Sequence, residues 1–172
     1  MDMKPFILLI ALTLMAAEPV QFLGKPYRLA AFSHKVNPLW EFTAPNETVE
    51  NWSTLLTIVD RPDAKTRPDL DRLAQGIMDT YKGNGGKVLM AKTFAGADGV
   101  PYNYMVVAFE QPAQKRYELN FVKAAMGAKN AYMAIYGVRV KDAKTFLNEH
   151  SAEIGKALEK AQLPPVAALP RK

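Results

Sequence analysis

Only two residues of the chain, His34 and His150, are of the type that most often acts as a general base near neutral pH. His34 directly follows Ser33, but neighbouring side chains on a strand point to opposite faces, so the two are not a nucleophile and its base. His150 falls on the apolar stripe of a predicted helix, which favours a buried, hydrogen-bonded structural histidine. A serine–histidine–acid site would therefore have to be assembled in space from distant segments.

The sequence offers few ligands for a metal ion. It contains no cysteine, and two histidines far apart in the chain leave oxygen atoms as the only further ligands. The aspartates between positions 60 and 71 lack the spacing of a calcium loop, and basic residues interleave with them. The glycine-rich stretch 82–87 follows a predicted helix, whereas a phosphate-binding loop opens one. We expect no metal site, no cofactor and no catalytic residues, and we predict that the protein is not an enzyme.

Aromatic and basic side chains are better candidates for binding chemistry. The net charge is +5, but no polybasic block is present, so nucleic acid is not an expected partner. Tyrosines on a sheet face commonly border the core with the hydroxyl in water, or else they line a binding surface. Tyrosine, tryptophan and arginine are enriched where interfaces are strong. The predicted binding residues are Trp52, Tyr132, Tyr136 and Arg139.

Local patterns predict seven strands and two helices. Apolar residues recur with helical spacing over 70–81 and over 143–161, where Gly83 suits the end of the first helix and Asp142 the start of the second. Runs rich in β-branched and aromatic residues predict the strands, over 27–32, 39–43, 55–60, 88–94, 102–110, 117–126 and 131–140.

The connections between the last four strands are too short for crossovers, so these strands must be antiparallel. In the segment 102–110, residues at both even and odd positions are apolar, so both faces of the strand are apolar. This predicts a central strand covered on both faces. Two amphipathic helices would then pack on opposite sides of the sheet. The predicted fold class is α+β: a three-layer α/β/α sandwich with a largely antiparallel sheet of about six to seven strands.

The first 17 residues form a separate segment. One lysine precedes an apolar run of about a dozen residues, which is too short to span a membrane but fits a secretory signal peptide. We predict a signal peptide or N-terminal anchor over 1–17, a linker over 18–26, one domain over 27–163 and a flexible tail over 164–172. The expected location is the periplasm. An uncleaved segment 1–17 would tether the protein to the membrane and would be its only expected membrane contact.

The stretch "APNETVENWSTLLTIV", residues 44–59, combines turn residues, a tryptophan and a strand. Thr48 suits the N-cap of a single helical turn over 49–51, and Trp52 then anchors the strand, which predicts a structural corner. "NETVENWSTLLT" resembles a corner in secreted bacterial proteins of the Mog1/PsbP/DcrB-like group. The matching residues are Glu47, Thr48, Asn51, Trp52, Leu56 and Thr57. Asn46 stands where that group has glycine, but asparagine tolerates positive φ.

The order of predicted elements over 27–161 is also similar to that group. The resemblance implies a mostly non-enzymatic role and offers no catalytic residues to carry over. We therefore expect an exported, non-catalytic binding or accessory protein that contacts another envelope or secreted protein, as an adaptor or as an immunity or inhibitor protein. The alternative is a small periplasmic hydrolase that uses His34 or His150.

Overall fold

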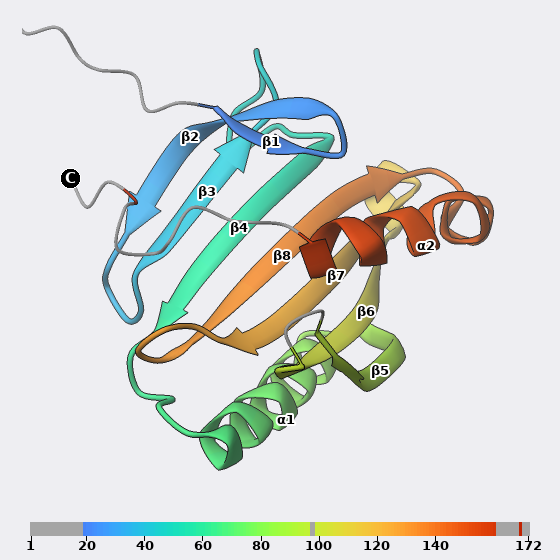
Figure 1. The fold of residues 1–172 in the computed structure, drawn as a ribbon. Coiled ribbons are helices and arrows are strands. Elements are labelled where there is room, and N and C mark those ends of the chain that lie inside the picture. The colour runs from blue at the N-terminus through green and yellow to red at the C-terminus, as the bar shows by residue number, and fades with distance from the viewer. Residues whose placement is uncertain (1–18, 97–98, 161–168, 170–172) are drawn as a thin grey trace, which may run out of the picture.

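The computed structural model describes residues 19–96, 99–160 and 169. Within them one eight-stranded sheet forms the body of the protein, and every pair of neighbouring strands is antiparallel (Figure 1). The elements are β1 (Val20–Phe22), β2 (Lys25–Ser33), β3 (Leu39–Thr43), β4 (Thr54–Arg61), α1 (Arg67–Gly83), β5 (Lys87–Ala95), β6 (Pro101–Gln111), the 3-10 turn η1 (Pro112–Gln114), β7 (Arg116–Met126), β8 (Ala131–Val140) and α2 (Ala143–Lys160).

The sheet consists of two meanders joined side by side. Its strand order is β1-β2-β3-β4-β8-β7-β6-β5, so β1–β4 form one half and β5–β8 the other. The two halves meet where β4 pairs with β8, from Thr54 opposite Val138 to Arg61 opposite Ala131. Consequently β1 and β5 are the two edges of the sheet, and the long connection through α1 takes the chain from the middle of the sheet to its β5 edge.

Capping residues fix the starts of both helices, and the sequence indicated one of them, Asp142. Thr66 caps α1, and its hydroxyl and the Asp69 side chain form a reciprocal capping box. At the start of α2, the Asp142 carboxylate accepts a hydrogen bond from the backbone N–H of Thr145 at 3.0 Å. Both helices therefore begin within a few residues of their predicted starts.

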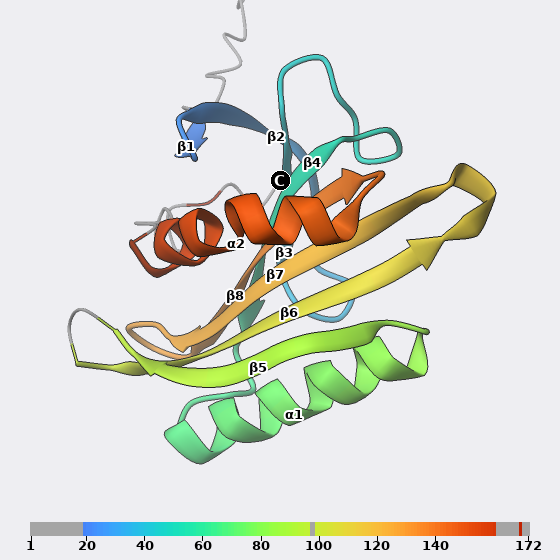
Figure 2. The ribbon, with the colours of Figure 1, turned by 90° about the vertical axis from the view of Figure 1, so that its right-hand side faces the viewer.

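The helices lie over opposite faces of the sheet, but each covers only part of its face (Figure 2). α1 packs mainly on β5, β6 and β7, and α2 packs mainly on β7 and β8. The predicted three-layer α/β/α sandwich with six to seven strands is therefore wrong. A helix is about 10 Å wide and strands are about 4.8 Å apart, so a single helix spans only two or three of the eight strands. The protein is an eight-stranded antiparallel sheet carrying two helices.

Two further expectations from the sequence need correction. The segment 18–26, assigned to a linker, contains β1, whose three residues are too few to show the alternation of a strand. β6 has apolar residues at both even and odd positions but is not central, because it is the second strand from the β5 edge of the sheet that the described residues form. It is buried on both faces because it lies between α1 and the core on the α2 side.

Two hydrophobic clusters fill the two faces. The cluster on the α2 side includes the fully buried Trp40, Tyr27 and Phe121 together with Ile154 and Leu158 of α2. The cluster on the α1 side joins Leu70, Leu73, Ala74 and Ile77 to β-strand residues such as Val107 and Val122.

Both predicted terminal segments fall largely outside the described residues. The predicted signal segment 1–17 lies outside them entirely, as does the predicted tail 164–172 apart from Leu169. Leu169 is 6% exposed and packs in the cluster on the α2 side. In the described chain, no helix is both long enough and apolar enough to cross a lipid bilayer.

Two substitutions on α1 should change stability in opposite directions. Leu70→Ala removes a fully buried side chain and should lower the free energy of unfolding by about 2–5 kcal/mol. At Gly76, in the middle of α1, an added Cβ would meet nothing within 4 Å among the described residues. Gly76→Ala should therefore raise the free energy of unfolding by about 0.5–1 kcal/mol. Urea unfolding of both variants and the wild type measures these shifts, and a destabilised Gly76→Ala variant would contradict the open environment of this glycine.

Stability should also fall at high pH because of tyrosines in the core. Burial raises the pKa of Tyr81 to about 12, and the nearby Glu118 carboxylate adds to the shift. Burial also strongly raises the pKa of Tyr104 and Tyr136. The unfolded chain loses these protons near pH 10, before the folded protein does, so this stabilisation is complete below pH 10 and is lost as the pH rises toward 12. Tyrosinate absorbance and circular dichroism should therefore change together, and Tyr81→Phe should make the alkaline transition shallower.

Candidate functional site

The corner at residues 44–53 is a compact structural unit. The Thr48 hydroxyl accepts the Asn51 N–H at 3.2 Å, as predicted, although the interval 49–51 forms bends and not a turn of helix. The Glu47 carboxylate accepts hydrogen bonds from the N–H and the hydroxyl of Ser53, at 3.1 and 2.5 Å. Asn46 has a φ of 68°, in the left-handed region that asparagine tolerates. Glu47 thus closes the corner across six residues, a role that the sequence alone did not reveal.

Trp52 anchors this corner to β8 and is only 7% exposed, as predicted for a structural tryptophan. The Arg139 guanidinium carbon lies 3.8 Å from the centre of the Trp52 ring, and its Nη1 donates to the Trp52 carbonyl at 3.3 Å. The Arg139 Nε lies 3.4 Å from the Glu118 carboxylate. A Cβ added to Gly137 would be 3.1 Å from Trp52 Cη2. Trp52 is therefore packed against both a glycine and an arginine of β8.

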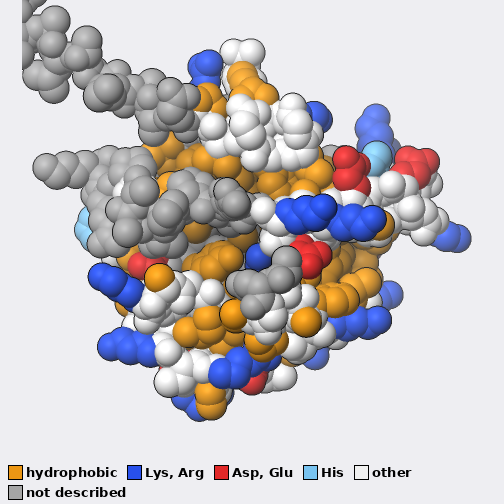
Figure 3. Space-filling view, viewed as in Figure 1, with side chains coloured by type: hydrophobic (Ala, Val, Ile, Leu, Met, Phe, Trp, Pro, Cys, Tyr) orange, Lys and Arg blue, Asp and Glu red, His pale blue; other side chains and the backbone are white. Residues whose placement is uncertain are grey.

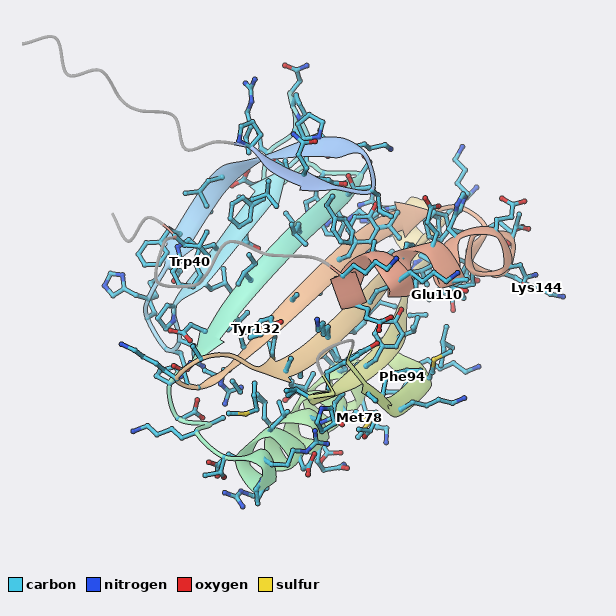
Figure 4. The ribbon with its side chains drawn as sticks, viewed as in Figure 1. Trp40, Met78, Phe94, Glu110, Tyr132 and Lys144 are labelled. Atoms are coloured by element: carbon cyan, nitrogen blue, oxygen red, sulfur yellow. The ribbon has the colours of Figure 1, made fainter. Side chains whose placement is uncertain are left out.

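The two tyrosines predicted to bind a partner lie on the opposite face of the sheet. Tyr136 is 4% exposed, and its ring packs against Phe22 at 5.0 Å and Tyr27 at 6.5 Å. Tyr132, labelled in Figure 4, is partly buried against the same cluster. The four predicted binding residues thus form a structural pair, Trp52 and Arg139, on the α1 side and two core-bordering tyrosines on the α2 side.

Both histidines lie at the surface. His150 was predicted to be buried, which is wrong: its side chain is 45% exposed, 3.7 Å from the Glu149 carboxylate, and its ring packs on Phe146 at 4.7 Å. His34 is exposed and stacks on Phe32. Neither histidine lines the two grooves described below. Among the described residues, no group of three histidine or acidic side chains is arranged to hold a metal ion.

The first groove runs beside α1 and has a volume of about 620 Å³. Apolar side chains such as Leu73, Ile77 and Met133 form part of its lining. The charged side chains at its rim are paired with one another, Arg61 with Asp63 at 2.7 Å and Arg72 with Asp69. The rim therefore carries no net charge to select a charged ligand.

The second groove, of about 420 Å³, lies over the Trp52 corner. It is more polar than the first and contains three basic side chains and one carboxylate. Its lining residues are Asn46, Glu47, Asn51, Trp52, Ser53, Gln114, Arg116, Arg139, Val140 and Lys141.

The most exposed apolar surface of the described chain lies along β5. Eight of the nine residues of this strand are exposed. Five large hydrophobic side chains are exposed in the described residues, and four of them belong to β5 and the turn that follows it: Leu89 (43%), Met90 (37%), Phe94 (39%) and Val100 (44%). We call these four residues the β5 edge surface. On the face seen in Figure 3, hydrophobic side chains reach the surface in the lower part of the molecule, among lysines and arginines.

The β5 edge surface was missed in the sequence because its apolar residues look like those of any strand. Phe94, labelled in Figure 4, stacks on Tyr102 at 5.8 Å and meets Tyr104 edge-on at 6.1 Å. Only the strand order shows that, within the described residues, no further strand covers this edge. No protein-family model matches the chain, and no curated protein matches it.

The packing of Trp52 on β8 can be tested at Gly137. A methyl group there would be 3.1 Å from both Trp52 Cη2 and the Asn120 side-chain oxygen, so Gly137→Ala should lower the free energy of unfolding by about 1–3 kcal/mol. The tryptophan emission should shift as the indole is displaced. Gly155→Ala is the matched control, because the nearest atom to its added Cβ is the Tyr104 hydroxyl oxygen at an ordinary 3.5 Å. Equal stability of both variants would contradict a tightly held indole.

Proposed function

We propose that the protein is an exported, non-catalytic binding protein of the bacterial envelope that holds another protein through its β5 edge. The single observation that carries this proposal is that, among the described residues, four of the five exposed large hydrophobic side chains lie on one edge strand and its turn. Contiguous exposed apolar surface marks an interaction site more often than scattered hydrophobic residues do.

The backbone of β5 is suited to binding an extended segment. Among the described residues β5 pairs only with β6, so its other edge carries unpaired N–H and C=O groups. β5 has nine residues, whereas β1 at the opposite edge has three. An added strand gains backbone hydrogen bonds along the edge, and its alternate side chains gain contacts with the apolar shelf. Met90 and Phe94 form that shelf, since they pair with Val106 and Tyr102 on the same face of the sheet.

The partner is a different protein and not a second copy of this chain. Lys87 and Lys92 are exposed on β5, and the pairing with β6 is irregular between Val88 and Met90. Lysines and bulges on an edge strand disfavour pairing with an identical edge. The same lysines favour a partner segment that alternates apolar residues with acidic ones.

The apolar segment 1–17 supports the exported location, and the resemblance of the Trp52 corner supports an accessory role. An adaptor for a secreted protein and an immunity or inhibitor protein are the two narrower forms of this proposal. Both use protein–protein contact, and neither needs a catalytic residue.

Affinity capture from envelope extract, followed by mass spectrometry, tests the use of β5. Met90→Glu places a charge in the middle of the β5 edge surface and should reduce the recovery of the partner about tenfold or more, because it buries an unpaired carboxylate at the contact. Val36→Glu is the matched control, because it introduces the same charge at a side chain that is 89% exposed and lies outside β5.

The wild type and Val36→Glu should recover the same protein in the same amount. If Met90→Glu recovers that protein equally well, the partner does not bind at β5. Circular dichroism of Met90→Glu should match the wild type, since the side chain is already 37% exposed.

A further inference from the structure

Three basic side chains converge in the groove over the Trp52 corner. Arg116 is the first residue of β7, Arg139 lies near the end of β8, and Lys141 follows β8 directly. The β7–β8 register pairs Glu118 with Arg139 and Tyr117 with Val140. Continuing it by one position puts Lys141 opposite Arg116. Like charges directly opposite one another on neighbouring strands are destabilising unless an anion lies between them.

Neither acidic group near this groove forms an ion pair with Arg116 or Lys141 in the described chain. The Glu118 carboxylate lies 3.4 Å from Arg139 Nε and also accepts hydrogen bonds from the Gln111 and Asn120 amides, at 3.1 and 3.3 Å. Glu47 is the only acidic residue among the described residues that line the groove; its Oε1 accepts two hydrogen bonds from Ser53, whereas its Oε2 is buried and accepts none from the described chain.

Arg116 therefore has no carboxylate partner within the described chain. Its Nε donates to the side-chain oxygen of Gln111 at 2.7 Å, and Gln111 in turn reaches Glu118. The Arg116 side chain is only partly exposed. A partly buried guanidinium is normally balanced by an anion, since its removal from water is otherwise costly. Within the described chain, the groove thus carries a guanidinium, that of Arg116, which forms no ion pair.

Several contacts hold the side chains that form the wall of the groove. Arg139 is fixed by its stacking on Trp52, by the Trp52 carbonyl and by Glu118, and Arg116 is oriented by Gln111. Guanidinium groups present several N–H donors in a plane that matches a carboxylate or a phosphate. Oriented donors lose little conformational freedom when an anion binds, so the groove is prepared for one.

We propose that this groove binds a small ligand through an oxyanion, either a phosphate or a carboxylate. Arg116 and Lys141 contact the oxyanion, and Trp52 with Arg139 forms the wall against which the rest of the ligand lies. The volume of about 420 Å³ suits a small organic anion. This site is separate from the β5 edge surface and does not depend on the partner proposed there.

Titration of the purified protein with inorganic phosphate and, separately, with succinate tests the site at constant ionic strength. Trp52 lines the groove, whereas Trp40, the other tryptophan, is fully buried on the α2 side, so a change in emission reports on the groove. Calorimetry on the same samples measures binding even if the emission does not change. The anion that binds with the higher affinity identifies the oxyanion class.

Arg116→Gln should weaken the preferred anion about tenfold or more, because it removes a charge-assisted contact while keeping a polar side chain. Arg72→Gln is the matched control: it removes one positive charge from an exposed side chain on α1, outside this groove, and should bind like the wild type. The proposal is overturned if neither anion binds the wild type by calorimetry, if Arg116→Gln binds as well as the wild type, or if both variants lose the same affinity.

Discussion

The pairing of β4 with β8 is the interaction on which the rest of the structure depends. Among the described residues, this is the one strand pair that joins the β1–β4 meander to the β5–β8 meander through backbone hydrogen bonds. The hydrogen bonds continue past both ends of β4, since the Arg139 N–H donates to the Ser53 carbonyl at one end and the Ala131 N–H to the Ala64 carbonyl at the other. The Trp52 corner directly precedes β4, and the start of α1 follows it after a short loop. Their positions therefore follow from the register of one strand pair.

The elements themselves were largely predictable because each is encoded locally. Runs rich in β-branched and aromatic residues predicted seven of the eight strands, and the spacing of Leu70, Leu73 and Ile77 predicted the first helix. Strand order and the extent of each layer are not local properties. The expected sandwich failed because amphipathic periodicity shows that a helix packs on a sheet, but not how much of the sheet it covers.

In the candidate sites, too, locally encoded features were predictable and features set by strand pairing were not. The burial of Trp52 was correctly predicted, since a tryptophan at the entry to a strand has a clear packing role. Grouping it with Tyr136 and Arg139 ignored a signal that was present: positions 136 and 139 differ in parity on β8 and so must face opposite sides. The basic groove was not predictable, because Arg116 and Lys141 are adjacent only through the β7–β8 register. Likewise, nothing in the composition of β5 indicates that it is the last strand of the sheet.

The burial of Leu169 has a practical consequence for handling this protein. It lies nine positions beyond Lys160, the last residue of α2, and packs among the residues that hold Trp40 and Tyr136. A chain shortened after Lys160 would expose part of that cluster to water, and an affinity tag attached at Lys172 would start only three residues from a buried anchor. Recombinant versions therefore need the chain at least through Leu169, with a spacer before any tag that follows it.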